Sequence, residues 1–376
     1  MFTLEPAMYP LTDNYTDAGY LQSSAAVLAE PDVSNDSELK QELLDRLNLT
    51  KYFVQACLKN HDPVVVWRRP LKTPASLCIT PAWERHYKAL EGLLEAPELR
   101  YSRSVWVDLF ERCVQALGLL DCHWYGPNPS AIVLQFDAQL ECFVERSDGQ
   151  TYGERFQALV EMIRREGRQP AFRQQVRQQA QDVRRNHDSA LAYNERLFEC
   201  RSRLVVIRLD LGYQRAVAQT LTLEQLARDL DRFVRNQRHN RLFKHLYGYV
   251  IKVEEGPLRG LHTHVVLYFL GSEVQKHEHL GDLIGRYWVE QITEGRGSYF
   301  NCNRVRYKHM GVGVVEHDDH DKRRHLRERV LGYLFKDDQH VRIKDRRVFR
   351  RGEMPVLPVT PMGRPRRTSH AAASVR

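Results

Sequence analysis

The sequence predicts a chain in two parts, a mainly helical N-terminal region followed by a C-terminal α+β domain. Apolar residues recur at a helical period through most of the first half of the chain. From Arg203 onward, β-rich runs alternate with helical segments in the order β-α-β-β-α-β-α. The length of 376 residues also allows two domains at the usual size of about 100–200 residues each.

The N-terminal half is expected to form a disordered leader, residues 1–36, and then a helical accessory region, residues 37–199. The leader contains three prolines among Ser, Asp and Asn and shows no sustained period. Helical periodicity begins at Ser37, and further helices are expected at 82–94, 105–119 and 152–165. The segment 129–145 stays open between helix and strand, because strand-like apolar runs also occur in it.

A long helix is expected to begin near Pro170, since proline is tolerated in the first turn of a helix. Its sequence, FRQQVRQQAQDVRRNHDSALAYNERLF, is rich in Gln and Arg. Such a helix can lie along DNA, but we favour a packing strut with a solvated face. No catalytic motif precedes residue 200.

The C-terminal domain is expected to span residues 200–352, with a disordered basic tail at 353–376. Its elements follow from local patterns of apolar residues, caps and turns. In chain order they are a strand at 203–213, a helix opened by a capping box at Thr222 and Gln225, a hairpin at 249–269, a helix at 280–292, a Gly-rich loop at 294–303, a strand within 305–317 and a helix at 322–338.

Composition excludes some classes of protein. No apolar run approaches the ~18 residues that cross a bilayer, and the N-terminus lacks the basic and apolar segments of a secretory signal. The seven cysteines are scattered singly, which argues against a disulfide framework and a structural zinc site. We therefore expect a protein of the cytosol with reduced thiols and no membrane partner.

Positive charge is concentrated near the C-terminus. The net charge is +8, and the stretch 322–350 alone holds eleven Lys or Arg against four Asp or Glu. A phosphate backbone is the natural partner of such a segment, although a solvated basic face would show the same composition. The candidate DNA-binding residues are Arg323, Arg324, Arg327, Arg342, Lys344, Arg346 and Arg347.

The predicted hairpin carries a candidate metal site. Side chains alternate across a strand, so His262 and His264 share one face, about 6–7 Å apart along it, and Thr263 points the other way. A carboxylate of Glu254 or Glu255 on the opposing arm could complete a three-ligand site for a divalent metal. Alternation does not choose cleanly between the two glutamates, and we favour Glu254. Two strand histidines could also simply line a polar face.

The last predicted helix carries a candidate nucleophile. Tyr333 and Lys336 are three residues apart, so both project from the same face of a helix. A phenol with a pKa of about 10 attacks poorly at neutral pH without a cation, and Lys336 supplies one. If this face packs against the histidine pair, Tyr333 could attack a metal-polarised phosphodiester and form a phosphotyrosine. Its helical spacing from Leu326 and Val330 is equally typical of a core residue.

These residues, in this order, resemble the motifs of HUH-type replication initiators and relaxases. The likeness is closest to the inovirus gene-two-type replication proteins, also called the YagK/YfjJ C-terminal family. Their "vvRvDL" strand is similar to residues 206–211, their H-x-H strand to His262 and His264, their "YL-x-K" helix to residues 333–336, and their trailing "R-x-F" to residues 347–349. The resemblance covers under half of the chain.

The resemblance implies an HUH-endonuclease domain with a central antiparallel sheet flanked by helices, both histidines on a central strand, and bound Mg²⁺ or Mn²⁺. It implies that Tyr333 nicks one DNA strand at a single-stranded or hairpin origin and starts rolling-circle replication of a phage or related mobile element in a bacterial cytosol. The protein would then be a single-strand DNA endonuclease and strand transferase. No nucleotide-binding P-loop is visible, so a host helicase and polymerase are expected partners.

Two features depart from the family pattern. Thr263 stands where the family has a large apolar residue, and the single candidate tyrosine leaves termination of replication unexplained. A non-catalytic DNA-binding regulator with an HUH-like fold fits the basic segment equally well, and a covalent protein–DNA species would separate the two. A 2H phosphoesterase is disfavoured, because no convincing second His-x-Thr/Ser motif accompanies the one at His262.

Overall fold

The computed structural model describes residues 33–69, 74–95, 104–124, 128–256, 259–335 and 348–357, with side chains from Asp45 onward. Most of the predicted leader and tail lies outside these ranges, as do Lys336, Arg342, Lys344, Arg346 and Arg347. The described part is a mixed α/β protein whose sheets are antiparallel, in agreement with the expected α+β class. None of its helices is long and apolar enough to cross a membrane.

The N-terminal half is built around one hydrophobic core. Phe53, Trp83 and Phe156 lie at its centre with ring contacts between them. The elements around it are α2 (Val33–Lys59), α3 (Pro81–Leu94), α4 (Val105–Ala116) and α5 (Tyr152–Gly167), with a two-stranded sheet of β1 (Val65–Arg68) and β2 (Ser76–Ile79) and a three-stranded sheet of β3 (Cys122–His123), β4 (Leu134–Asp137) and β5 (Cys142–Glu145). A capping box of Thr151 and Glu154 begins α5.

The segment that was ambiguous between helix and strand folds as a β-hairpin. β4 pairs with β5, and the rings of Phe136 and Phe143 face each other across the pair with centroids 5.6 Å apart. Aromatic residues favour strands through such cross-strand contacts. Glu141, in the turn, has a positive φ of 52°. The mainly helical region therefore contains short strands as well.

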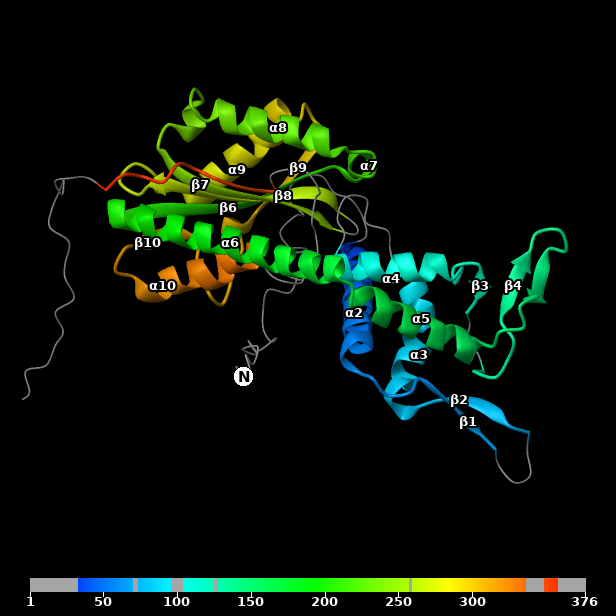
Figure 1. Ribbon diagram of the computed structural model, residues 1–376. Coiled ribbons are helices and arrows are strands. Elements are labelled where there is room, and N and C mark those ends of the chain that lie inside the picture. Colours follow the sequence, from blue (N-terminus) through cyan, green and yellow to red (C-terminus); the bar gives the residue numbers. More distant parts are fainter. Residues whose placement is uncertain are drawn as a thin grey trace, which may run out of the picture.

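A single helix, α6 (Pro170–Cys200), connects the two halves of the chain (Figure 1). Its first turn places Phe172 in the N-terminal core, and its last turns place Tyr193 and Leu197 in a core beneath the large sheet. No residue from 173 to 189 is buried. The helix is thus anchored at both ends and solvated between them, which agrees with its interpretation as a strut.

The C-terminal part is organised around a six-stranded antiparallel sheet. Its strands are β6 (Arg203–Tyr213), β7 (Leu246–Gly256), β8 (Gly260–Leu270), β9 (Gly297–Asn301), β10 (Gly313–Glu316) and β11 (Phe349–Arg351). Their order is β10-β6-β8-β7-β11, and β9 shares one edge of β6 with β10. The predicted strand at 203–213 and the hairpin are confirmed.

Two strands of this sheet were not predicted. β9 lies in the segment expected to be a Gly-rich loop, and β11 follows the last predicted helix. Within β9, Gly297 and Asn301 are of types depleted in strands, whereas Tyr299 and Phe300 are of types enriched in them, so the segment has no clear intrinsic preference. It becomes a strand because the free edge of β6 offers its backbone hydrogen-bond partners.

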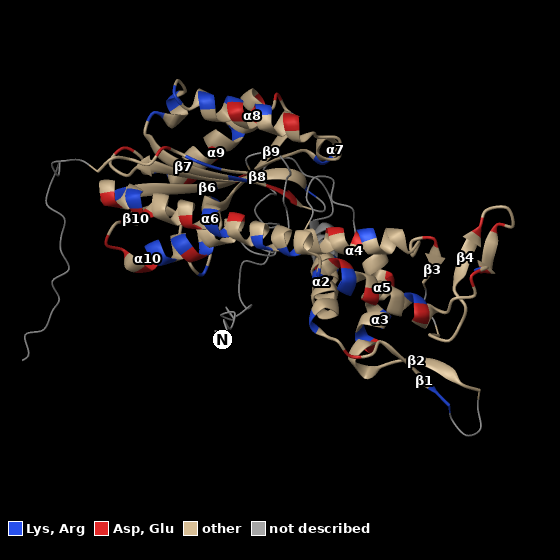
Figure 2. Ribbon diagram, viewed as in Figure 1, with Lys and Arg blue, Asp and Glu red and all other residues tan. Residues whose placement is uncertain are grey.

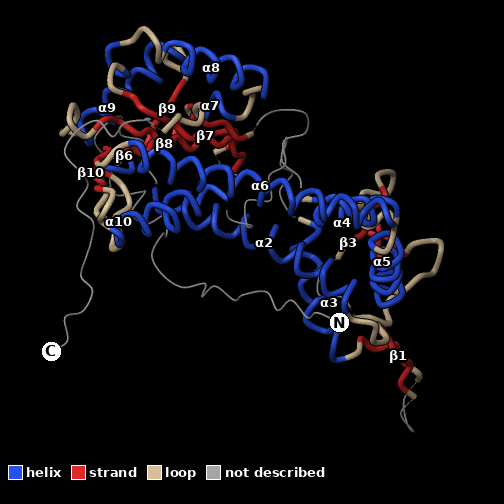
Figure 3. Tube along the Cα trace, turned by 60° about the vertical axis from the view of Figure 1, so that its left-hand side comes forward, coloured by secondary structure: helices blue, strands red, loops and turns tan. Residues whose placement is uncertain are grey.

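Helices cover both faces of the sheet (Figures 1 and 3). One face packs against α8 (Leu223–Asn236), α9 (His277–Tyr287) and the π-helical turn η3 (Trp288–Ile292). The other packs against α6, α10 (His320–His325), the π-helical turn η5 (Leu326–Leu331) and the 3₁₀ turn η6 (Gly332–Phe335). Short turns complete the domain: α7 (Arg215–Ala218), η2 (Arg241–Phe243) and η4 (Cys302–Arg304). The capping box predicted at Thr222 and Gln225 is present at the start of α8.

The last predicted helix is not a continuous α-helix. α10 changes to π geometry in η5 and to 3₁₀ geometry in η6. Gly332, a weak helix former, stands at the second change. Leu326, Val330 and Leu334 are buried as their spacing predicted. The regular α-helix expected around Tyr333 was therefore wrong, although Tyr333 packs against the same core as these three residues.

Candidate metal centre

Strand register gathers six polar side chains on one face of the sheet. Asp210 on β6 stands opposite His264 on β8, and Glu254 on β7 stands opposite His262. Residues two apart on a strand share a face. The face shared with His262 and His264 therefore carries Arg208, Asp210, Lys252 and Glu254. It is the face toward α6 and η6, because Val206, Val250 and Val266 on the same face belong to that core.

Glu254, His262 and His264 form a compact group of metal-ligand type. One ligand atom from each lies within 4.8 Å of the others. Glu254 Oε2 is 3.0 Å from His264 Nε2 and 4.0 Å from His262 Nε2. The register also decides between the two glutamates, since Glu255 stands opposite Leu261 on the other face. The structure thus brings together the three residues favoured from the sequence.

Each imidazole is oriented by a hydrogen bond from its other nitrogen. His262 Nδ1 lies 3.1 Å from the Gly260 carbonyl oxygen, which can only accept, so Nδ1 carries the proton. His264 Nδ1 donates to Asp210 Oδ1 at 2.6 Å. Both rings therefore present Nε2 to Glu254. Such partners fix the tautomer and ring orientation of metal-ligating histidines.

Asp210 was not predicted as part of the site. The sequence did carry a signal, because Arg208 and Asp210 alternate on a strand rich in apolar residues and so share one face. What was missing was the register that sets this face beside His264. Arg208 Nε lies 3.6 Å from Asp210 Oδ1, and both side chains are buried.

Burial and charge set the protonation states in the metal-free site. Burial alone would lower the pKa of His264, but the carboxylates of Asp210 and Glu254 outweigh it and raise the pKa to about 9. Burial and the positive charge of His264 lower the pKa of His262 to about 4. Although burial opposes it, the same positive charge holds the pKa of Glu254 and Asp210 below their usual values. Without a metal, the protonated ring of His264 bridges the two carboxylates, because Nδ1–H donates to Asp210 and Nε2–H donates to Glu254.

The three side chains fit a divalent cation. Ligand atoms at about 2.1 Å from an ion, as in Mg²⁺ and many Zn²⁺ sites, lie about 3–4 Å from one another. The two measured separations from Glu254 Oε2 match this range. Two imidazole nitrogens and one carboxylate oxygen leave further coordination positions open for substrate or water. The buried Glu254, His262 and His264 group could therefore hold a divalent metal ion.

Tyr333 lies against this group. Its ring meets the imidazole of His264 edge to face, with centroids 5.5 Å apart and planes at 86°. The guanidinium of Arg208 lies over the ring, 4.5 Å from its centroid. Tyr333 is partly buried, unlike the fully buried Leu334 beside it. Tyr333 therefore lies beside His264, as expected, but it belongs to the 3₁₀ turn η6 and not to a regular α-helix.

Lys252 lies at the site, whereas the predicted Lys336 is outside the described residues. Its Nζ lies 3.2 Å from Glu254 Oε1 and donates to the carbonyl oxygen of Leu334. It also lies 5.2 Å from the centroid of the Phe335 ring. Lys252 therefore joins η6 to the strand that carries Glu254. The sequence did not single it out, because its role depends on the packing of η6.

The predicted DNA-binding arginines that are described lie apart from the site. Arg323 pairs with Glu195 of α6, lies 4.9 Å from the Phe198 ring centroid and is largely buried. Arg327 Nη1 lies 3.4 Å from Glu195 Oε1, and the exposed Arg324 pairs with Asp321. Arg323 and Arg324 belong to α10 and Arg327 to η5, and Figure 2 shows the Lys and Arg of α10 on a helix that lies beside α6 and contacts β10. The structure thus gives Arg323 a packing role and does not bring the three to the metal group.

Comparisons with family models, curated proteins and solved structures return no significant match.

Proposed function

We propose that this chain is a metal-dependent DNA-strand nicking enzyme of HUH type in which Tyr333 is the nucleophile. The observation that carries the proposal is the edge-to-face contact between Tyr333 and His264, which sets a phenol beside the Glu254, His262 and His264 group. Mg²⁺ or Mn²⁺ would be held by these three residues. Either ion, when bound, supplies charge neutralisation and polarisation of a phosphodiester.

The chain's own residues account for activation of the phenol. The guanidinium of Arg208, 4.5 Å from the ring centroid, favours the build-up of negative charge on Tyr333 as its proton leaves. The Oη–P bond forms as the bond between phosphorus and the 3′ oxygen breaks. The net reaction moves the phenolic proton to that oxygen, giving a free 3′ hydroxyl and a 5′ phosphotyrosine. Asp210 holds His264 in the tautomer that ligates metal.

Initiation of rolling-circle replication of a phage or related mobile element is the role we propose for this reaction. The new 3′ hydroxyl can prime synthesis, and the linked 5′ end stays with the protein. A replication origin is then the substrate, in a bacterial cytosol. Since the sequence has no P-loop, unwinding and synthesis fall to a host helicase and polymerase.

The test is capture of the covalent adduct. Single-stranded oligonucleotides labelled at the 3′ end and tiling the DNA on both sides of this chain's own gene are incubated with the protein in Mn²⁺ or Mg²⁺. We expect one region to give a labelled species that migrates with the protein under denaturing conditions. EDTA and Tyr333→Phe should each abolish it, whereas Tyr52→Phe, at a tyrosine that is 54% exposed in the N-terminal half, should not.

Two results would reject the proposal. An adduct that persists in Tyr333→Phe would assign the nucleophile to another residue. Tight origin binding without any adduct in either metal would favour the alternative, a DNA-binding regulator that keeps an HUH-like fold without catalysis.

A further inference from the structure

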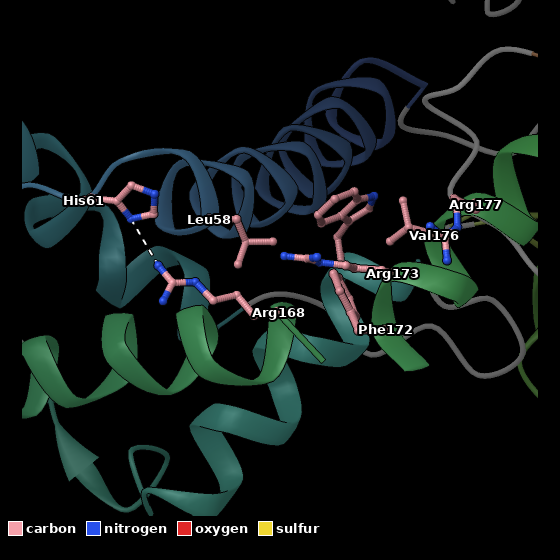
Figure 4. A pocket seen from close by; sticks show the side chains of 9 residues that line it. Leu58, His61, Arg168, Phe172, Arg173, Val176 and Arg177 are labelled. Carbon is pink, nitrogen blue, oxygen red and sulfur yellow. Dashed lines mark hydrogen bonds between the residues drawn. The ribbon is translucent and has the colours of Figure 1, made fainter. Parts of the chain in front are cut away.

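A cavity of about 440 Å³ lies where α2, α4, α5 and α6 meet, away from the sheet (Figure 4). Its lining divides into an apolar floor and a basic rim. The floor consists of Leu58, Trp106, Phe172 and Val176, and the rim consists of His61, Arg168, Arg173 and Arg177. The volume lies within the range of ligand-binding pockets.

The first two turns of α6 supply four of the nine lining residues. Phe172 and Val176 are four residues apart and form an apolar ridge, while Arg173 and Arg177 form a basic ridge beside it. A glycine at the end of α5 lets the floor close, since a Cβ on Gly167 would lie only 2.4 Å from Leu58 Cδ2. The pocket is therefore built from helices fixed by the N-terminal core.

The rim carries positive charge that no acid among the described side chains neutralises. Within the described ranges, Arg168, Arg173 and Arg177 form no ion pair with a carboxylate. Arg168 Nη2 lies 3.2 Å from His61 Nδ1, and Figure 4 shows Arg173 reaching across the floor toward Leu58. Farther along the same helix, by contrast, other arginines pair with aspartates. The rim thus favours an anionic ligand.

The floor adds an aromatic platform. Trp106 is only partly buried, and Phe172 holds its indole edge to face, with centroids 5.4 Å apart and planes at 79°. An aromatic surface beside arginines is the combination with which proteins bind single-stranded nucleic acid, because bases stack on the rings and phosphates meet the guanidinium groups.

We propose that this pocket binds an unpaired nucleotide of a single-stranded DNA, with the base on Trp106 and the phosphates on Arg168, Arg173 and Arg177. The choice of DNA rests on the proposed function. The helix α6 links the two sites, because it begins at the pocket and also reaches η6. Its His187 ring lies 5.3 Å from the ring of Phe335, and Phe335 contacts Lys252 beside the metal group. From His187 back to Arg177 is about 15 Å of helix, a distance that a few nucleotides of an unpaired strand cover.

The metal group lies near the end of the sheet where β6 finishes and α7 begins. This end of the strands carries Asp210, Glu254, His262 and His264. In Figure 1 this end faces the N-terminal helices. A strand engaged at Tyr333 can therefore continue along α6 to the pocket. The N-terminal half would then hold the DNA on one side of the nick.

The test is binding of fluorescein-labelled dT₂₀ to the full chain in EDTA, followed by fluorescence anisotropy. Arg173→Ala combined with Arg177→Ala should weaken binding about tenfold and lower the slope of log K against log salt by about 1.4, the value for two phosphate contacts to a single strand. The matched control is Arg235→Ala with Arg238→Ala, which removes the same charge from the C-terminal end of α8 and the turn after it. It should change affinity less than about twofold, because α8 covers the opposite face of the sheet from α6 and the metal group.

Tryptophan fluorescence tests the stacking of a base on Trp106 separately from the attraction of DNA to the arginine charges. Binding of unlabelled dT₂₀ should quench the wild-type emission, and Trp106→Phe should lose most of that quenching. Equal weakening in both arginine pairs, or quenching that survives in Trp106→Phe, would overturn the pocket. Tighter binding of rU₂₀ than dT₂₀ through the same residues would overturn the choice of DNA. Pocket-dependent binding without any covalent adduct would keep the pocket and reject the nicking function.

Discussion

The face of the large sheet that meets α6 and η6 has two unlike halves. At one end of the strands, Val206, Val250 and Tyr268 pack into a hydrophobic core with the helices. At the other, the residues four positions along the same strands are Asp210, Glu254 and His264. All of them are buried. One alternating pattern thus builds a core and a polar site on the same face.

The comparison shows how a buried site of this kind is tolerated. Burying a charge without a partner is costly, whereas burying an apolar side chain is favourable. Each charge in the polar half has a partner, because Asp210 and Glu254 both contact His264, and Lys252 contacts Glu254. The apolar half supplies stability that offsets the cost of burying these polar side chains. Substitutions in the two halves should therefore have separable effects.

The largest effect is expected from His264→Ala compared with Leu204→Ala. His264→Ala should lower Mn²⁺ affinity more than about 100-fold, because it removes one of the three ligands and the ring that orients Glu254. Leu204→Ala, in the apolar half, should cost about 2–5 kcal/mol of unfolding free energy and leave Mn²⁺ affinity unchanged. Titration calorimetry with Mn²⁺ and urea unfolding measure the two quantities. Equal loss of metal affinity in both variants would show that the halves are not separable.

Adjacent glutamates provide a second comparison across the two faces of β7. Glu254→Gln should lower Mn²⁺ affinity about 100-fold, since a neutral amide oxygen replaces a charged ligand. Glu255→Gln should leave it nearly unchanged, because Glu255 stands on the opposite face. Both affinities come from the same calorimetric titration. The reverse ranking would mean that the register of the hairpin differs from the one described.

A smaller effect is expected from Asp210→Asn, which keeps every ligand but weakens the partner of His264. Loss of the carboxylate should lower Mn²⁺ affinity about 10–100-fold. It should also lower the pKa of His264 in the metal-free protein, since Asp210 is a main cause of its rise to about 9. Histidine resonances followed by NMR as a function of pH measure that pKa. An unchanged pKa would contradict the assigned hydrogen bond.

The smallest effect is a pH dependence of stability in the metal-free protein. His264 has its pKa raised to about 9, so its contribution is complete below about pH 6.5 and is lost as pH rises toward 9. The pKa of His262 is lowered to about 4, so its contribution is complete above about pH 6.5 and is lost as pH falls toward 4.

Urea unfolding in EDTA should therefore show stability falling on both sides of about pH 6.5, by at most about 1.4 kcal/mol per pH unit for each proton. Saturating Mn²⁺ should remove the alkaline loss, because the metal replaces the proton on His264. A metal-free stability that keeps rising from pH 6.5 to 9 would contradict the raised pKa.

Much of the polar half could be predicted because strand alternation is a local rule. The spacing of His262 and His264 places both rings on one face without knowledge of the rest of the fold. The spacing of Arg208 and Asp210 likewise places both side chains on one face of their strand. The local sequence does not show which strand lies beside them. Choosing Glu254 over Glu255 likewise needed the register of β7 against β8.

The packing of η6 could not be predicted from periodicity. The sequence favoured a regular helix, and the structure has α, π and 3₁₀ turns in succession. Such changes depend on which side chains the sheet accepts, as the ring contacts of Tyr333 and Phe335 show. The pocket beside Trp106 was missed for a related reason, since it combines residues from α2, α4 and α6 that are far apart in the chain.

Linkage of DNA to Tyr333 is tested most directly by mass spectrometry of the adduct after nuclease and trypsin digestion. We expect the peptide of residues 330–336 to carry the mass of a nucleotide on its single tyrosine. A nucleotide on any other tyrosine, or an adduct that forms equally in His264→Ala without added metal, would contradict it.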